Sequence, residues 1–484
     1  MDAAAELVLV NPPIGGEERY GELAGGGNYM PPLGICILAN CARSRGVSVA
    51  IVDAERLEMT PQQACSSILD YSPAFVGITA TTTAIHNAAH LAGLIRQSAP
   101  QTTIIAGGPH VSIIPEETMS RFPQFDCGVL REGESTLFEL MDAIKNKRKL
   151  DTIPGIVRRE NGAVKINPHR PFISDLDTVP FPAWDLLPCL PRYYRGPVHS
   201  YIKLPNSSLV TTRGCPGQCT FCSQWSIFRR VFRAHSAEYV FEMMEKLWLD
   251  YRVRDVYFLD DTFTVDRERI VRLCEILISR KWKQVWSCQS RVNFVDPEML
   301  SLMKRAGCWQ TAYGVESGSQ LILDFLKKGV TLDQIRTALL WTKKAGIRTR
   351  GFFMIGVPRE TTGTIRETIA FSRKLPLDDL HVSLFVPYPG SELYETACQF
   401  GDFNPDWRRM NGWFVVFVPS GLTEAQLIAW QKTMFRAFYF RPRIIISYLK
   451  LLSNPVQLKR AFTGLFGLLN FLIRKKSKKT DFCT

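Results

Sequence analysis

The chain alternates short apolar strand patterns with helical patterns in two separate stretches, and this alternation constrains its fold more than any other feature. In the first stretch, strand patterns occur at 6–10, 47–52, 75–79, 102–106 and 127–130. Helical patterns lie between them, at 33–45, 61–71, 84–98 and 116–122. Strands this short, separated by helices of this length, indicate a doubly wound parallel sheet. Such sheets bind ligands at the carboxyl ends of their strands.

A proline-rich segment separates this first unit from a second one. Nine prolines lie between residues 151 and 206, and proline at this frequency disfavours long helices and central strands. We interpret 149–206 as a short hairpin followed by an extended linker. The alternation then returns, with strand patterns at 208–212, 256–259, 285–289, 310–315, 349–355 and 381–386. Six strand–helix repeats fit a partial parallel barrel as well as an open sheet.

The predicted fold class is therefore α/β, in four parts. A doubly wound, Rossmann-like domain spans 1–148 and a proline-rich linker spans 149–206. A second α/β unit, a partial (β/α)6 barrel or an open sheet, spans 207–400, and a helical, basic C-terminal segment spans 401–484.

Three cysteines follow the first strand of the second unit in one short loop. Cys215, Cys219 and Cys222 form a C-x3-C-x2-C set in the sequence RGCPGQCTFC. Three thiolates at this spacing can bind three irons of a [4Fe–4S] cluster and leave the fourth iron open to a substrate. The alternatives are buried structural thiols or a zinc site completed by a distant histidine. The other ten cysteines form no second close cluster, which disfavours a four-cysteine zinc site.

The loop, with aromatic Phe221 before its last cysteine, resembles the signature of the radical S-adenosylmethionine (SAM) superfamily. The resemblance implies that the open iron binds the amino and carboxylate groups of SAM. It also implies reductive cleavage of SAM to a 5′-deoxyadenosyl radical, and an electron donor such as flavodoxin or ferredoxin.

The resemblance also implies SAM contacts at the ends of later strands. Besides Phe221, the predicted SAM-binding residues are Asp260, Asp261, Glu316, Ser317, Ile355, Gly356 and Val357. Carboxylates at the carboxyl ends of parallel strands point into the mouth of a barrel, where sites are built. Two adjacent acids can also belong to a turn or a helix cap, and the choice between Asp260 and Asp261 stays open.

Loops follow three strands of the first unit, at 79–83, 107–110 and 131–135, and the last two contain glycine. The order of a domain with GGPH and EGES loops, a linker and a radical SAM barrel resembles the cobalamin-dependent radical SAM enzymes. The resemblance implies that cobalamin binds in the N-terminal domain, and the predicted contacts are Thr79, Thr82, Gly107, Gly108, Pro109, His110, Gly133 and Glu134. The alternatives are ordinary tight turns, or a scaffold that no longer binds cobalamin.

The D-x-H-x-x-G motif, whose histidine ligates cobalt in many cobalamin domains, does not occur in this sequence. Neither His86, His90 nor His110 fits its spacing. We therefore expect no histidine ligand below cobalt.

The C-terminal segment carries most of the charge. From Lys432 to Thr484 there are 12 Lys/Arg against one acid, which accounts for +11 of the net charge of +13. An apolar stretch at 461–473 is followed by a basic run at 474–479. Thirteen residues are too few to span a bilayer. The stretch fits peripheral contact with an anionic membrane, or a helix that caps the barrel. No aromatic residue interrupts the basic run, which disfavours nucleic-acid binding.

The sequence thus favours a cobalamin-dependent radical SAM enzyme that methylates an unactivated carbon of a small-molecule or lipid-like substrate. The alternatives are an oxidative cyclase of the magnesium-protoporphyrin type and a non-catalytic cobalamin or redox sensor. Thirteen cysteines and an N-terminus without a basic leader predict a cytoplasmic protein, with peripheral contact at the inner face of the membrane as an option.

Overall fold

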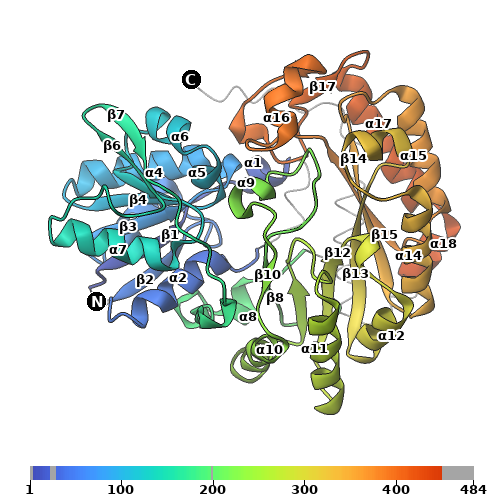
Figure 1. Ribbon diagram of the computed structural model, residues 1–484, viewed down its shortest axis with the longest axis horizontal. Coiled ribbons are helices and arrows are strands. Elements are labelled where there is room, and N and C mark those ends of the chain that lie inside the picture. Colours follow the sequence, from blue (N-terminus) through green and yellow to red (C-terminus); the bar gives the residue numbers. More distant parts are fainter. Residues whose placement is uncertain (1–3, 22–28, 198–199, 450–484) are drawn as a thin grey trace.

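The computed structural model describes residues 4–21, 29–197 and 200–449, which form two α/β units side by side (Figure 1). The N-terminal unit is the doubly wound sheet that the alternation predicts. Its five parallel strands run in the order β2-β1-β3-β4-β5. Their bounds are β1 Leu7–Asn11, β2 Val49–Asp53, β3 Phe75–Thr79, β4 Thr103–Gly107 and β5 Cys127–Val129.

Helices cover both faces of this sheet, which explains why its strands are apolar throughout. On β1, Leu7 and Leu9 pack in one apolar cluster, and Val8 and Val10 pack in another. The helices of this unit are α1 Gly16–Tyr20, α2 Leu33–Arg43, α3 Pro61–Leu69, α4 Ile85–Ser98, α5 Pro109–Ile113, α6 Pro115–Arg121 and α7 Gly133–Lys145. Helix α7 was not among the predicted helices, and the EGES stretch expected as a loop forms its start.

The start of the proline-rich segment belongs to the N-terminal sheet. Strands β6 Ile156–Glu160 and β7 Ala163–Ile166 form the predicted hairpin, and β6 pairs antiparallel with β5. The hairpin therefore extends the sheet instead of opening a linker. The rest of the segment runs between the units with two short 3-10 turns and helix α8 Leu190–Tyr193.

The second unit is a curled parallel sheet of six strands, in the order β15-β14-β13-β12-β11-β8. Because β8 and β15 do not pair, the barrel is partial, as predicted. The strands are β8 Asn206–Leu209, β11 Asp255–Phe258, β12 Val285–Ser290, β13 Cys308–Glu316, β14 Arg348–Ile355 and β15 Asp379–Leu384. The helices that follow them are α10 Ala237–Tyr251, α11 Arg267–Ser279, α12 Pro297–Arg305, α13 Gln320–Phe325, α14 Leu332–Lys344 and α15 Thr362–Lys374.

The first predicted barrel strand is divided in the structure. Only Asn206–Leu209 joins the large sheet, whereas β9 Thr212–Arg213 pairs antiparallel with β10 Arg233–Ala234. This two-stranded ladder closes the base of the segment that carries the three cysteines and helix α9 Gln224–Phe228.

The C-terminal segment is not helical throughout, so the prediction for 401–419 is wrong. After α16 Glu392–Thr396, strands β16 Gly401–Phe403 and β17 Phe417–Pro419 form an antiparallel hairpin. The turn between them packs Trp407 onto the N-terminal unit, against His110. Helices α17 Glu424–Tyr439 and α18 Pro442–Leu449 follow, and α17 packs on β15 and α15. The apolar stretch 461–473 and the basic run 474–479 lie outside the described residues.

Candidate cofactor-binding and active site

The cysteine loop contains two glycines, and no other residue could replace Gly214 without strain. Gly214 has a φ of +86°, and a Cβ there would lie 2.2 Å from the backbone oxygen of Val231. A Cβ on Gly217 would lie 2.8 Å from Nη1 of Arg291. The backbone nitrogen of Thr220 donates to the carbonyl of Leu326 at 3.0 Å, which fixes the loop to the end of α13. These constraints hold the three thiols in one place.

Hydrogen-bond donors surround the sulfur atoms. Arg291 Nη1 donates to Cys219 Sγ at 3.2 Å, and the backbone nitrogen of Gly217 lies 3.5 Å from Cys215 Sγ. The pKa of the Cys222 thiol is raised to about 12, mainly by burial and to a smaller extent by the neighbouring Cys219, Asp261 and Cys215. The three cysteines are therefore close enough to interact electrostatically, and ligation to iron would remove this cost of ionisation.

The donors around the three thiols fit an iron–sulfur cluster. Among the described residues, no group of three or more His, Cys, Asp or Glu side chains converges on one metal position. In a [4Fe–4S] cluster each cysteine binds a different iron, so such convergence is not required. Donors to sulfur are also the contacts that tune such clusters. Cys215, Cys219 and Cys222 would hold it.

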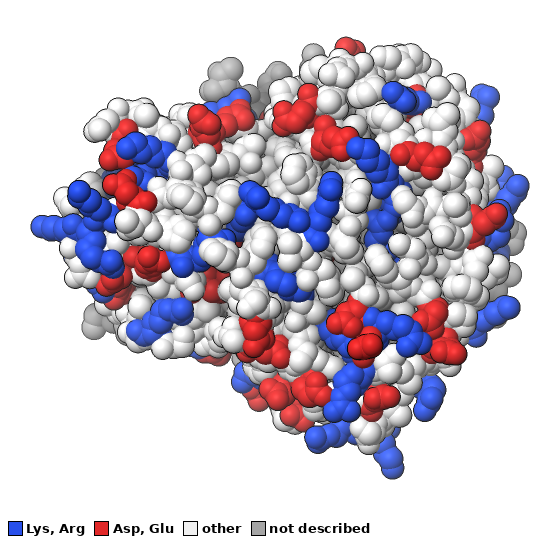
Figure 2. All heavy atoms as spheres, viewed as in Figure 1, with Lys and Arg blue, Asp and Glu red and all other residues white. Residues whose placement is uncertain are grey.

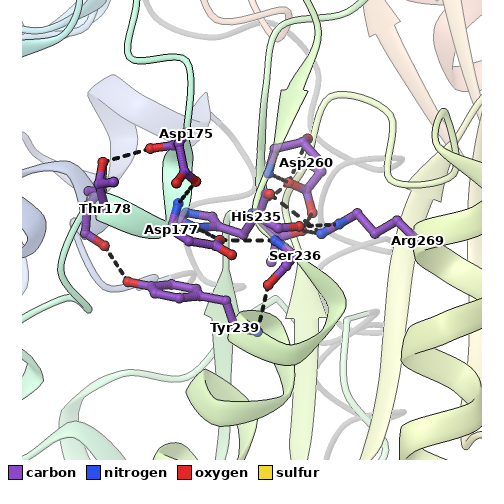
Figure 3. Close-up of polar contacts among 11 residues, drawn as sticks. Asp175, Asp177, Thr178, His235, Ser236, Tyr239, Asp260 and Arg269 are labelled. Carbon is purple, nitrogen blue, oxygen red and sulfur yellow. Dashed lines mark hydrogen bonds and ion pairs between the residues drawn. The ribbon is translucent and has the colours of Figure 1, made fainter.

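The two adjacent aspartates occupy different environments. Asp260 is buried. Its carboxylate accepts from the backbone nitrogen of Thr211 at 2.7 Å, and it also accepts from the hydroxyl of Thr211 and from the hydroxyl of Thr212. Figure 3 shows Arg269 beside Asp260. The guanidinium of Arg269 donates to the hydroxyl of Thr211 and to the carbonyl of His235. Asp260 is thus a structural anchor at the base of the loop.

Asp261 instead faces the cysteine loop. Its carboxylate accepts from the side chain of Gln224, the first residue of α9, and its charge acts on Cys222. The side chain is exposed at the mouth of the barrel. Of the two acids, Asp261 is the one placed to contact a small molecule bound to the cluster.

Glu316 ends β13 in a left-handed conformation, with a φ of +64°. Its carboxylate accepts from Lys328 Nζ at 2.7 Å, and both side chains are buried. The same ammonium lies 5.9 Å from the ring of Phe221, so a charged pair sits beside the cysteine loop. Ser317 is fully buried and its hydroxyl bonds to Thr368 of α15 at 3.0 Å. Its contact with SAM stays a prediction.

The backbone at the end of β14 is held by a glutamate that the sequence analysis did not single out. Glu360 Oε2 accepts from the nitrogen of Gly356 at 2.6 Å and of Val357 at 3.2 Å. Burial raises the pKa of Glu360 to about 8. Gly356 needs its positive φ of +87°, while Ile355 and Val357 are fully buried. Adenine contact by these residues stays a prediction.

The GGPH loop packs tightly inside the N-terminal unit. A Cβ on Gly108 would lie 2.7 Å from Thr79 Oγ1, so the ends of β3 and β4 can approach only at glycine. Gly107 ends β4, and Pro109 begins α5. His110 is fully buried, 3.3 Å from Thr82 Oγ1 and 4.5 Å from the Trp407 ring, and burial lowers its pKa to about 3. Its side chain packs in the interior, so its contact with cobalamin stays a prediction.

The EGES stretch, at the start of α7, lies at the interface between the two units instead of facing open space. Glu134 Oε1 accepts from Arg213 Nη2 at 2.5 Å. Glu132 Oε1 accepts from Arg213 Nη1 and from Arg233 Nη1, each at 2.7 Å. Arg213 lies two residues before Cys215, on β9. Gly133 and Glu134 therefore sit at the interface with the cysteine segment, and a cobalamin contact there stays a prediction.

A cavity of about 560 Å³ lies between the two units. On one side it is lined by Asn11, Asp53 and Thr79, at the ends of β1, β2 and β3. This is the switch point of the sheet, where the strand order reverses and ligands bind. Thr79 is the one predicted cobalamin residue among the lining residues. From the barrel come Tyr257, Gln289, Arg350, Phe352 and His381, on the inner faces of their strands.

Sequence reasoning missed several residues of the site as a whole: Arg291, Lys328 and Arg350. Arg291 directly follows β12, so its position at a strand end was a usable signal. Lys328 and Arg350 gave no such signal, because their roles depend on contacts with other elements. Lys328 donates to Glu316 of β13, and Arg350 pairs with Asp379 of β15. Arg350 is buried, pairs with Asp379 at 3.5 Å, and has no hydrogen-bond partner in the described residues for Nε and Nη1.

Comparisons with known proteins agree with this division. A family model for the Radical SAM superfamily matches residues 209–372, and one for the B12 binding domain matches residues 23–141. An uncharacterized methyltransferase of Pyrococcus horikoshii is 34% identical over 461 residues, 95% of this chain and 98% of that protein. The anaerobic magnesium-protoporphyrin IX monomethyl ester cyclase of Rubrivivax gelatinosus is 28% identical, covering 85% of this chain and 74% of the cyclase.

Solved structures share the fold over nearly the whole chain. The radical SAM methyltransferase TsrM of Kitasatospora setae, with cobalamin and a [4Fe–4S] cluster bound, matches with a TM-score of 0.72 at 18% identity. That match covers 96% of this chain and 99% of TsrM. The cobalamin-dependent SAM radical enzyme OxsB matches with a TM-score of 0.74 at 20% identity, covering 97% of this chain and 72% of OxsB.

The fold and the site define an enzyme with a radical SAM barrel joined to a cobalamin-binding domain. The chain belongs to the cobalamin-dependent radical SAM family. Its cofactors are a [4Fe–4S] cluster, SAM and cobalamin, and such enzymes need an electron donor and a small-molecule substrate.

Proposed function

We propose that this enzyme methylates an unactivated carbon of a small molecule bound in the cavity between the two units. The observation that carries the proposal is the cavity itself. The switch point of the cobalamin domain lines one side, and inward-facing residues of the barrel line the other. When bound, SAM supplies the radical and the methyl group, and cobalamin carries the methyl group.

The protein's own residues would hold and orient these groups. Arg291 donates to the Cys219 sulfur. Asp261, exposed beside Cys222, would accept from the SAM ammonium, while Asp260 holds the loop. Arg350 lines the cavity, and its Nη1 has no hydrogen-bond partner in the described residues, which favours a substrate with a hydrogen-bond-accepting or acidic group.

The methyl label distinguishes this function from cyclisation. The protein would be reconstituted anaerobically with iron, sulfide and cobalamin and incubated with a cell extract and SAM carrying a deuterated methyl group. Mass spectrometry should find an extract metabolite that gains the labelled methyl group. The Cys219→Ala protein should lose both this product and the cluster absorbance. An altered metabolite without the label would favour a cyclase, a function that the similarity to the Rubrivivax protein keeps as the second candidate.

We further propose that the C-terminal tail makes peripheral contact with an anionic membrane. Among the described residues, no helix is long and apolar enough to cross a bilayer. The support is the sequence: +11 of the net +13 lies from Lys432 onward, next to the apolar stretch 461–473. Full-length protein should sediment with anionic vesicles at low salt, and a chain ending at Asn454 should not. Equal sedimentation of the two proteins would refute the contact.

A further inference from the structure

Three arginines without carboxylate partners lie beside the cysteine loop. Arg131 follows β5, and Arg229 and Arg230 follow α9; we call these three residues the arginine patch. Arg229 and Arg230 are exposed and Arg131 is half-buried. Within the ranges that the structure describes, none of them forms an ion pair with an acid. Arg131 Nη2 lies 3.4 Å from the carbonyl oxygen of Ser226 in α9, which places it against the same helix.

The patch lies at the end of α9, the helix that follows the cysteines. Helix α9 begins at Gln224, two residues after Cys222, and Gln224 bonds to Asp261. Figure 2 shows a band of Lys and Arg side chains near the middle of the visible face, where Figure 1 places α9. Few acidic side chains interrupt this band, so the surface around α9 is positively charged.

The backbone turns sharply where α9 ends. Arg229 and Arg230 both have positive φ, at 49° and 60°, and Arg229 is the left-handed residue that terminates the helix.

Apolar side chains lie between these charges. Trp225 is 41% exposed and Val231 is 43% exposed. The guanidinium of Arg230 lies 5.9 Å from the Trp225 ring. Tryptophan and arginine around an exposed apolar centre are typical of protein–protein interfaces, where they supply most of the binding energy.

We infer that the arginine patch and Trp225 are the docking surface for the electron donor, a small electron-transfer protein with an acidic face. This inference rests on the proposed function, because a donor is required only if the cluster must be reduced. Electron transfer slows steeply with distance, so the donor must dock close to the cysteine loop. Opposite charges would steer the acidic face to this position and set its orientation.

A nucleic acid fits this surface less well. Single strands bind along extended grooves in which several aromatic side chains stack on successive bases. Here one exposed tryptophan accompanies a compact group of charges. The geometry therefore favours a compact protein face.

The test is the rate of cluster reduction by two reductants. Reconstituted full-length protein would be mixed anaerobically with a reduced, acidic bacterial flavodoxin, and separately with dithionite, and the cluster absorbance followed by stopped flow. The Arg229→Glu/Arg230→Glu protein should be reduced by flavodoxin at least about tenfold more slowly than wild type at low salt. Reduction by dithionite should be unchanged. Added salt should slow wild type strongly and the variant little.

Two further variants make the result specific. Trp225→Ala should slow reduction by flavodoxin while keeping its salt dependence. Lys147→Glu/Lys149→Glu reverses two exposed charges at the far end of α7 and should behave as wild type. Equal flavodoxin rates in wild type and the patch variant, or equal losses in the patch and control variants, would overturn the docking surface. Failure of dithionite to reduce any of the proteins would instead refute the cluster and the proposed function together.

Discussion

At the scale of single residues, adjacent aspartates have separate tasks. Asp260→Asn would place an amide opposite donors from Thr211 and Thr212 and leave buried Arg269 without its counter-charge. We expect a loss of about 3 kcal/mol in the free energy of unfolding.

Asp261→Asn should fold as wild type but bind SAM about tenfold more weakly, a cost of about 1.4 kcal/mol in binding free energy. Urea unfolding and equilibrium dialysis of the reconstituted proteins separate the two effects. Unchanged SAM affinity in Asp261→Asn would remove that residue from the site.

Glu360 should make stability depend on pH. Its pKa is raised from the ordinary 4.5 to about 8, so the folded protein binds a proton that the unfolded chain releases. Stability should therefore fall as pH rises between these two values. Glu360→Gln still accepts from Gly356 and Val357 but cannot ionise, so its urea midpoint should change less across this range. Glu367→Gln, at an exposed position of α15, is the control and should follow wild type. Parallel pH profiles for all three proteins would contradict this role of Glu360.

The residues that sequence reasoning identified share one property: each belongs to a local motif or ends a strand. Cys215, Cys219 and Cys222 were evident from spacing alone, because cluster ligation needs closely spaced thiols. Arg350 and Lys328 were not, since their partners lie on other strands or distant in the chain. The burial that raises the pKa of Glu360 likewise depends on packing that no local pattern reports.

At the scale of elements, the link between the EGES loop and β9 couples the two units. Arg213 is mostly buried between Glu132 and Glu134, so Arg213→Met would leave Glu134 without its cation and Glu132 paired with Arg233 alone. We expect a destabilisation of about 3 kcal/mol in urea unfolding, partly reversed when Glu134→Gln is added. The exposed pair of Arg272 and Glu238 is the control, and Arg272→Met should cost less than about 0.5 kcal/mol. A small effect of Arg213→Met would show that this contact does not hold the units together.

The positions of the histidines in the N-terminal unit predict whether one of their imidazoles binds cobalt. His86 and His110 pack against Trp407, and neither lines the cavity. Electron paramagnetic resonance of the Co(II) protein should therefore lack nitrogen splitting from an imidazole of the N-terminal unit. If splitting appears and disappears in His381→Ala, the ligand comes from the barrel residue that lines the cavity. Splitting that persists in His381→Ala but is lost in His110→Ala would contradict the placement of His110 in the interior.

Most elements could be predicted from the sequence, but their pairing could not. Apolar periodicity located the strands of both sheets within a few residues, because burial on both faces requires it. It gave no sign that β6 would join β5, that the first barrel strand would divide at Val210, or that 401–419 would form a hairpin. Each of these depends on contacts between segments distant in the chain, such as the packing of Trp407 on His110.

At the scale of the whole molecule, the cavity between the units explains why both are needed. The strand ends of the cobalamin domain and the inner face of the barrel meet around one space of about 560 Å³. The EGES–Arg213 contacts and the turn that carries Trp407 join the two units. A substrate bound there would be reached from both sides, which suits chemistry that uses two cofactors.

The most direct test of this account is the fate of SAM during turnover. Because SAM is assigned two roles, as radical source and as methyl donor, reconstituted enzyme with cobalamin, a reductant and its methyl acceptor should release 5′-deoxyadenosine and S-adenosylhomocysteine together. Both should accumulate in equal amounts, matched by the methylated product, and both should vanish in Cys219→Ala. Formation of 5′-deoxyadenosine with an altered substrate but without S-adenosylhomocysteine would contradict methyl transfer.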